Sequence, residues 1–320
     1  MSTILFSLLV FVAAGIGMWV ISHVMEGLRP APPIPRSLRW APDIPIEYVD
    51  VGGNTLRYIK AGSGSALVLL HTLRTQLDLF EKVVAELSKD FTVYALDYPG
   101  HGYSDIPQTD YHADFFADAV EGFLEVLDLN DAALAGVSIG GSISLIIAGR
   151  GNARVARVVA INPYDYAEGE GMARSSLLGR IIVATSKIPV IGETVMRLRN
   201  FIIMKAVLRG GVAKSSNIPG ALLAEMYHVG DRKGHYRAFI GLLRNAASWE
   251  AATKIYSAIP VPVLLVWGDK DWATQTERDQ HQKLIPNVEV VTVEGGGHFL
   301  PLDRPNEVVS HIKRFAAASG

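Results

Sequence analysis

The chain of 320 residues contains no cysteine, and its formal net charge at neutral pH is only −2. The absence of cysteine excludes a disulfide scaffold, thiolate zinc sites and a cysteine nucleophile, and it leaves the redox compartment open. The small net charge gives no indication of a nucleic-acid partner. Because 49% of the residues are hydrophobic and 19% are charged, the chain has enough apolar side chains for a sizeable core.

Charge is also missing from the N-terminal region, where residues 4–25 include no Asp, Glu, Lys or Arg. A helix of this length would run about 33 Å, enough for a bilayer core of about 30 Å. A cleaved signal peptide is the alternative, but it usually has basic residues before a shorter apolar run. We therefore predict a single-pass transmembrane anchor at 1–27 that contacts membrane lipid. The arginines that follow it place the globular domain in the cytoplasm by the positive-inside tendency.

A stiff linker and a single large domain are expected after the anchor. Residues 28–45 form the linker, in which the stretch 30–45 contains six prolines. From 46 to 318, short apolar runs alternate with helical patterns, which predicts an α/β fold with a mostly parallel sheet flanked by helices. The predicted strands are 46–51, 55–61, 66–71, 91–97, 132–137, 157–162, 261–268 and 288–294. The predicted helices include 78–89, 111–128, 139–150 and 305–317.

One segment interrupts this alternation. Residues from about 165 to 255 contain several apolar helical patterns and no strand-like run. This segment lies between two predicted core strands, and in open α/β sheets the ligand crevice lies at the carboxyl ends of the strands. We therefore predict an inserted helical cap over that edge; additional scaffold helices are the alternative.

The stretch 136–141, Gly-Val-Ser-Ile-Gly-Gly, contains a G-x-S-x-G motif centred on Ser138. Chance gives roughly 0.2 such matches in a chain of this composition, so the context has to decide. A nucleophile elbow requires a strand, a sharp turn and a helix, and Ser138 stands between a predicted strand and a predicted helix. The sequence therefore predicts that Ser138 is a nucleophile.

A serine nucleophile needs a base, and His298 is the best candidate among the nine histidines. It follows the last predicted strand through three glycines, so it lies on a loop at the carboxyl edge of the sheet. His281 and His311 fall within predicted helices and are expected at the surface. His228 and His235 lie in the predicted cap, where a substrate contact is an option but a solvated histidine is favoured.

The acid that orients the base is expected near the end of the strand 261–268. Asp271 is better placed to lie deep in the following loop, whereas Asp269 is expected to tighten the turn. Asp165, just after the strand 157–162, is a second candidate for the acid.

An oxyanion hole needs two N–H donors, for which the backbone groups of Ile139 and Leu73 are predicted. Leu73 lies in the loop after the strand 66–71, together with His71, Thr72 and Arg74, which are candidate substrate-binding residues. Arg74 could bind a carboxylate or phosphate of the substrate, or form a surface salt bridge.

These stretches resemble the α/β-hydrolase superfamily in its capped serine hydrolase branch, over residues from about 45 to 318. The similar stretches are "LDYPGHGYSD" (96–105), "GVSIGG", "VPVLLVWGDKD" and "GGGHF". The resemblance implies a Ser138, Asp271 and His298 triad with Leu73 and Ile139 as oxyanion donors. The chain departs from the family at Thr72, where Gly is usual, and at Gln275, where Pro is common. A β-branched Thr does not readily adopt glycine angles, so an unusual hole is expected.

The expected activity is hydrolysis of a carboxylic ester, with an apolar or lipid-like small molecule as substrate. Epoxide hydrolases and haloalkane dehalogenases resemble the chain but use an Asp at the elbow, so Ser138 argues against both. The resemblance also extends to membrane-anchored esterases and monoacylglycerol lipases. Two alternatives stay open: hydrolysis of a C–C bond, and a catalytically silent binding or scaffold protein. The resemblance implies no cofactor and no metal, and the sequence contains no motif for either.

Overall fold

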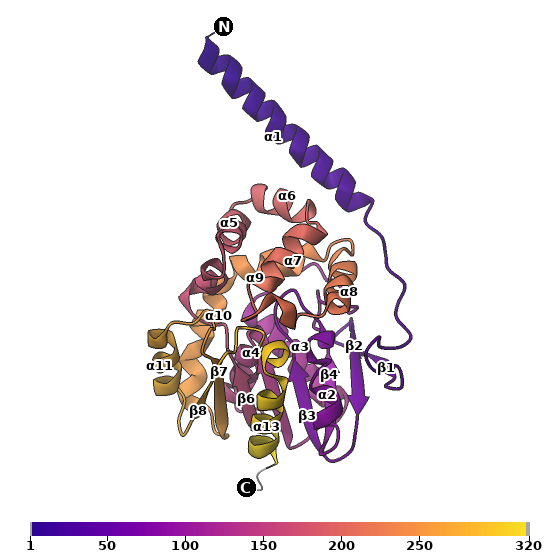
Figure 1. Ribbon diagram of the computed structural model, residues 1–320, viewed down its shortest axis with the longest axis vertical. Helices are drawn as coiled ribbons and strands as arrows, with labels where there is room; N and C mark the ends of the chain where they lie inside the picture. The colour runs from indigo at the N-terminus through magenta and orange to yellow at the C-terminus, as the bar shows by residue number, and fades with distance from the viewer. Residues whose placement is uncertain (1, 318–320) are drawn as a thin grey trace.

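The computed structural model describes residues 2–317. In these residues eight strands form one sheet, in the spatial order β1-β2-β4-β3-β5-β6-β7-β8 (Figure 1). The strands are β1 (Ile46–Val51), β2 (Asn54–Ala61), β3 (Ser65–Leu70), β4 (Phe91–Leu96), β5 (Ala132–Val137), β6 (Val155–Ile161), β7 (Val263–Gly268) and β8 (Glu289–Val293). β1 and β2 form an antiparallel hairpin, β2 pairs antiparallel with β4, and every remaining pairing is parallel. The carboxyl ends of the parallel strands therefore meet at one edge.

Helices cover both faces of the sheet, as the near-continuous apolar strands require. The helices of the core domain are α2 (Val84–Leu87), α3 (Ala113–Val126), α4 (Ile139–Gly149), α11 (Gln275–Leu284), α12 (Leu300–Asp303) and α13 (Pro305–Ala316). Successive side chains of β3 point to opposite faces: Val68 and Leu70 belong to the core cluster with α3 and α4, and Leu67 and Leu69 to the cluster with α2, α12 and α13. The predicted fold class is confirmed.

The segment between β6 and β7 contains helices and no strand, and it lies over the carboxyl edge of the sheet (Figure 1). Its helices are η2 (Ala167–Arg174), α5 (Leu177–Ser186), α6 (Ile191–Arg197), α7 (Phe201–Arg209), η3 (Ser215–Asn217), α8 (Gly220–Gly230), α9 (Tyr236–Arg244), α10 (Ala246–Ala252) and η4 (Thr253–Ala258). We call residues 162–262 the cap. The carboxyl edge of the sheet is thereby enclosed between core and cap.

The N-terminal helix α1 (Thr3–Gly27) projects from the cap side of the molecule (Figure 1). Its apolar stretch has a mean hydropathy of 2.6 and is not covered by the rest of the chain, so the helix is long and apolar enough to span a membrane. A signal sequence would meet the same description. Residue 1 of the predicted anchor, like residue 318 of the predicted domain, lies outside the described residues.

The last turn of α1 is fastened to the cap by buried charges. Glu26 accepts hydrogen bonds from the guanidinium groups of Arg29 (3.1 Å) and Arg199 (2.6 Å) and from the backbone N–H of Gly234 (2.6 Å). Arg29 also pairs with Asp231. In the proline-rich linker, the Trp40 indole donates to Asp78 (2.8 Å), so this side chain contacts the domain.

The prediction of one helix at 78–89 is wrong. The segment forms the short 3₁₀ helix η1 (Leu77–Phe80) and then α2. The carboxylate of Asp78 in η1 accepts hydrogen bonds from the side chains of Arg57 (3.0 Å) and Gln76 (2.8 Å) as well as from Trp40. These contacts bind the first turn to neighbouring segments, and the backbone there forms tight i→i−3 turns, with the Glu81 N–H on the Asp78 carbonyl (3.2 Å) and the Val83 N–H on the Phe80 carbonyl (2.9 Å).

Candidate active site

Ser138 occupies the sharp turn between β5 and α4, with φ 59° and ψ −122°. This conformation is strained for a residue with a side chain. The glycines of the motif make the turn sterically feasible: a Cβ on Gly136 would collide with the Gly140 carbonyl, and one on Gly140 with the Leu70 carbonyl. The strand–turn–helix context predicted for Ser138 is therefore present.

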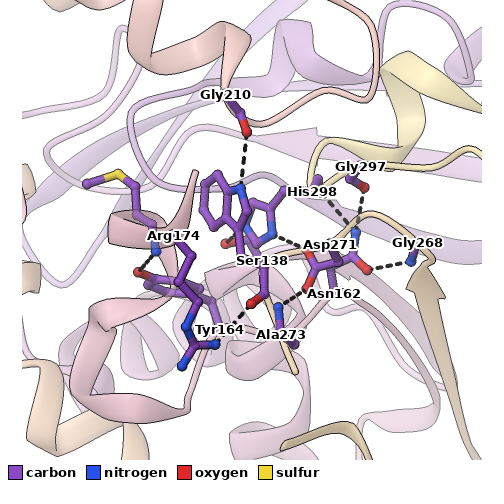
Figure 2. A network of polar contacts seen from close by, with 12 residues as sticks. Ser138, Asn162, Tyr164, Arg174, Gly210, Gly268, Asp271, Ala273, Gly297 and His298 are labelled. Carbon is purple, nitrogen blue, oxygen red and sulfur yellow. Dashed lines mark hydrogen bonds and ion pairs between the residues drawn. The ribbon is translucent and has the colours of Figure 1, made fainter. Parts of the chain in front are cut away.

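The side chains of Ser138, His298 and Asp271 form one hydrogen-bonded chain (Figure 2). The Ser138 hydroxyl lies 2.8 Å from Nε2 of His298, and Nδ1 of His298 lies 2.5 Å from Oδ2 of Asp271. A proton on Nδ1 makes His298 a donor to Asp271 and leaves Nε2 free to accept from the serine. Ser138 and His298 are 2% and 1% exposed, so this chain is shielded from bulk water.

The other two candidate acids have different partners. Asp269 accepts a hydrogen bond from the Gly296 backbone N–H (3.0 Å) and so ties the loops after β7 and β8 together. Asp165 is buried against Nε2 of His281 and the Tyr256 hydroxyl. Of the three aspartates, Asp271 is the one in contact with His298.

Asn162, which sequence reasoning did not single out, holds together the loops that carry His298 and Asp271. Its amide donates to the carbonyls of Gly297 and His298 (3.0 Å each) and accepts from the Gly268 N–H (2.8 Å), as Figure 2 shows. It adopts φ 46° directly after β6. Asparagine tolerates this left-handed conformation better than most residues, and that is the signal that could have identified it.

Trp272 was also missed. Its ring stacks on the His298 imidazole with centroids 3.7 Å apart and planes 13° apart. Its indole N–H donates to the Gly210 carbonyl of the cap (3.1 Å). The stacking fixes the orientation of the imidazole, and the aromatic residue directly after Asp271 was the available signal.

The backbone N–H groups of Leu73 and Ile139 have no hydrogen-bond acceptor within residues 2–317. Ile139 begins α4, so its N–H is one of the free donors of a helix N-terminus. Thr72 does not have a positive φ; within this loop the left-handed residue is Arg74, at 62°. The glycine-like angle expected at Thr72 is therefore not required there.

The His71 side chain stabilises the loop after β3 through two hydrogen bonds. Its Nδ1 donates to the Thr72 carbonyl (2.8 Å), and its Nε2 accepts from the Tyr98 N–H (3.3 Å). Burial lowers the pKa of His71 to about 3, so the ring is neutral. Thr72, Leu73 and Arg74 line the cavity that contains Ser138, whereas His71 does not.

Two histidine predictions need correction. His281 is buried rather than exposed, because its position on α11 brings it to the Asp165 carboxylate. His235 is buried rather than solvated: it directly precedes α9 in the cap and faces His101 with ring centroids 6.2 Å apart. His228 is exposed and His311 is partly exposed.

The fold and this arrangement define the class of protein. The alpha/beta hydrolase family model matches residues 67–311, so the chain belongs to that family and is a hydrolase. It is 29% identical to 2-(acetamidomethylene)succinate hydrolase of Mesorhizobium japonicum, over 84% of this chain and 94% of that protein. It is 23% identical to human monoacylglycerol lipase ABHD6, over 81% of this chain and 77% of that protein.

A crystal structure described as a membrane phospholipase A, a bacterial virulence factor, has the same fold over almost the whole chain. The TM-score is 0.70 with 22% sequence identity, and the alignment covers 99% of this chain and 98% of that one. Because it covers 99% of this chain, the likeness extends beyond the hydrolase domain into the N-terminal region.

Proposed function

We propose that the protein is a membrane-anchored serine hydrolase that cleaves a carboxylic ester with an apolar or lipid-like acyl group. The observation that carries the proposal is the hydrogen-bonded chain from Asp271 through His298 to Ser138, with the serine on a strained elbow beside a cavity. A hydroxyl is a weak nucleophile near neutral pH, and such a chain activates it.

The proposed reaction proceeds in two acyl transfers. Ser138 Oγ attacks the ester carbonyl carbon while its proton passes to Nε2 of His298, and the N–H groups of Leu73 and Ile139 hold the developing oxyanion. The C–O bond to the alcohol then breaks, and His298 returns the proton to the leaving oxygen. Water repeats the sequence on the acyl-enzyme and releases the carboxylic acid. Asp271 keeps its negative charge throughout and stabilises the imidazolium form of His298.

The cavity beside Ser138 supports an apolar acyl group. Its walls include Met172, Val207, Leu208, Phe239 and Phe299, and a second apolar cavity adjoins it under the cap. Burial of methylene groups against such walls contributes about 0.8 kcal/mol each. The relation to a monoacylglycerol lipase agrees with this chemistry.

The anchoring part of the proposal rests on α1. Its apolar stretch is uncovered, and its last turn is ion-paired to the cap through Glu26 and Arg29, so a bilayer around α1 would lie on the cap side of the domain. Apolar esters concentrate in that bilayer. The arginines after the helix favour a cytoplasmic domain.

A fluorophosphonate probe applied to isolated membranes tests the proposal. We expect covalent labelling of Ser138, located by peptide mass spectrometry, and loss of labelling in His298→Ala. Ser138→Ala should abolish turnover without changing thermal unfolding. Resistance of the labelled protein to alkaline carbonate extraction, with the intact mass of the full chain, would separate an anchor from a cleaved signal sequence.

A substrate panel then separates the reaction classes. Acyl esters of increasing chain length are compared with vinylogous diketones, which a C–C bond hydrolase would prefer. We expect ester hydrolysis. An unlabelled Ser138 in folded protein, or turnover of diketones alone, would contradict the proposal.

A further inference from the structure

Arg74 occupies a backbone position that disfavours arginine. The Thr75 N–H donates to the Thr72 carbonyl (3.2 Å), which closes a turn over residues 72–75 with Arg74 in its third position at φ 62°. Glycine or asparagine takes this conformation readily, whereas the Cβ of arginine is strained there. Strain of this kind at a ligand cavity is characteristic of residues held in place for function.

The Arg74 guanidinium also lacks a counter-ion. Within residues 2–317 no hydrogen bond or ion pair reaches this group, and its Nη1 is fully buried. The guanidinium carbon lies over the face of the Phe239 ring, 5.3 Å from the ring centroid. Burial, together with the charges of Arg199 and Arg29, lowers the pKa of Arg74 to about 9. The group therefore remains cationic at neutral pH.

Neighbouring charges do not neutralise this cation. Arg29 and Arg199 are matched by the carboxylates of Glu26 and Asp231 through the ion pairs at the end of α1. His235 is buried without a hydrogen-bond partner, and burial together with the charge of Arg74 lowers its pKa well below 6.5, so it is neutral. The charge of Arg74 is left in excess.

Arg74 stands where two cavities meet. One contains Ser138, the other lies among the cap helices, and both are lined by Arg74, Val207, Leu208 and Phe239. Each cavity has a volume of about 30 Å³, and their walls are otherwise mostly apolar. An apolar site with one unpaired cation is complementary to a molecule that is apolar except for one anionic group.

We propose that Arg74 binds an anionic group of the substrate, a carboxylate or a phosphate, so that the preferred esters carry a negative charge close to the scissile bond. The inference rests on the proposed serine hydrolase function and names its substrate class. The planar guanidinium presents paired N–H donors that match either anion. A lipid phosphate and the free carboxylate of a dicarboxylic half-ester share this chemistry.

Two matched substrate pairs test the proposal with the full-length protein in detergent micelles. The phosphate pair is a 1-acylglycerol 3-phosphate and the 1-acylglycerol with the same acyl chain. The carboxylate pair is 4-nitrophenyl hemisuccinate and 4-nitrophenyl butyrate. The measured quantity is the ratio of kcat/KM for the anionic to the neutral member of each pair. The pair with the larger ratio in the wild type identifies the source of the anion.

We expect Arg74→Met to lower that ratio by about 10- to 100-fold, because the variant loses one or two charge-assisted hydrogen bonds to the anionic group. Arg74→Lys, which keeps the charge but not the planar fork, should retain part of the preference. Arg180→Met is the matched control, because Arg180 is exposed on α5, lines neither cavity and should leave the ratio unchanged.

A ratio near one in the wild type for both pairs, or one that Arg74→Met does not change, would overturn the inference. The measurements distinguish failure of this inference from failure of the proposed function. Labelling of Ser138 with turnover of neutral esters would preserve the serine hydrolase and remove the anion site. Absence of labelling and of all ester turnover would remove both.

Discussion

The buried contact between Asp165 and His281 predicts that Asp165 stabilises the fold, in contrast to Asp271, which we propose is the catalytic acid. Asp165 lies against His281 on α11 and against the Tyr256 hydroxyl, and the side chains of this ion pair are at most 4% exposed. Substitution Asp165→Asn removes the charge that compensates His281. Breaking a buried pair costs about 3–5 kcal/mol, which for a folded domain of this size lowers Tm by roughly 5–9 °C. Thermal unfolding followed by circular dichroism measures the loss.

The same pair predicts how stability depends on pH. Burial lowers the pKa of His281, but the charge and hydrogen bond of Asp165 outweigh it, so the pKa is raised overall. Burial raises the pKa of Asp165, and His281 reverses this, so that pKa is lowered overall. The contribution of His281 is complete below its unfolded pKa of about 6.5 and is lost as the pH rises through its raised folded value.

The contribution of Asp165 is present above its unfolded pKa of about 3.9 and is lost as the pH falls through its lowered folded value. The wild type should therefore exceed Asp165→Asn in stability most clearly between about pH 4 and 6.5, and the difference should shrink at higher pH. A difference that grows from pH 6 to pH 9 would refute this reasoning.

Asp271→Asn is the contrasting variant, because Asp271 contacts His298 and not His281. It should lower kcat by about 10³- to 10⁴-fold with a much smaller change in Tm, since the amide does not hold the required tautomer of the base. If Asp165→Asn lowered kcat as strongly and left Tm unchanged, Asp165 would be the acid and the assignment of Asp271 would be wrong.

Three further predictions follow from other contacts. Arg74→Asn should raise the free energy of unfolding by about 1 kcal/mol or more in urea titration, because it relieves left-handed strain and an unpaired charge; a decrease would show that Arg74 is structural. Glu26→Gln should cost about 3–5 kcal/mol because it leaves buried Arg199 without its counter-ion, whereas the partly exposed control Glu86→Gln should cost far less. Because the chain has no cysteine, Thr109→Cys provides a single exposed thiol. If the domain is cytoplasmic, a membrane-impermeant maleimide should leave this thiol unlabelled in intact cells and should label it once the cells are permeabilised.

The fold and the relative order of the site residues could be read from the sequence because their signals are local. Strand, elbow and helix are contiguous around Ser138, and His298 follows three glycines at the end of a strand. His281 gave no such signal. It lies on a helix of mostly polar residues, and its partner Asp165 is 116 positions away, so its burial depends on tertiary contacts that no local pattern encodes.

Backbone strain is the part of the site that sequence patterns described least well. Arg74, Ser138 and Asn162 have φ of 62°, 59° and 46°, and they follow β3, β5 and β6, which are adjacent in the sheet. A neighbouring strand holds two of them, because the Ser138 N–H donates to the Ile161 carbonyl and the Asn162 N–H to the Val266 carbonyl. The Arg74 turn is closed within itself, by the Thr75 N–H on the Thr72 carbonyl.

A strand end fixed on both sides can impose angles that an isolated peptide would avoid, so the regular sheet makes the strain at its carboxyl edge sustainable. The G-x-S-x-G motif indicates one of these positions, Ser138, because the turn around the serine has no room for side chains at the two motif glycines. Arg74 and Asn162 have no flanking glycines, and only the assembled edge reveals that a left-handed residue follows each of three neighbouring strands, Arg74 four residues after the end of β3.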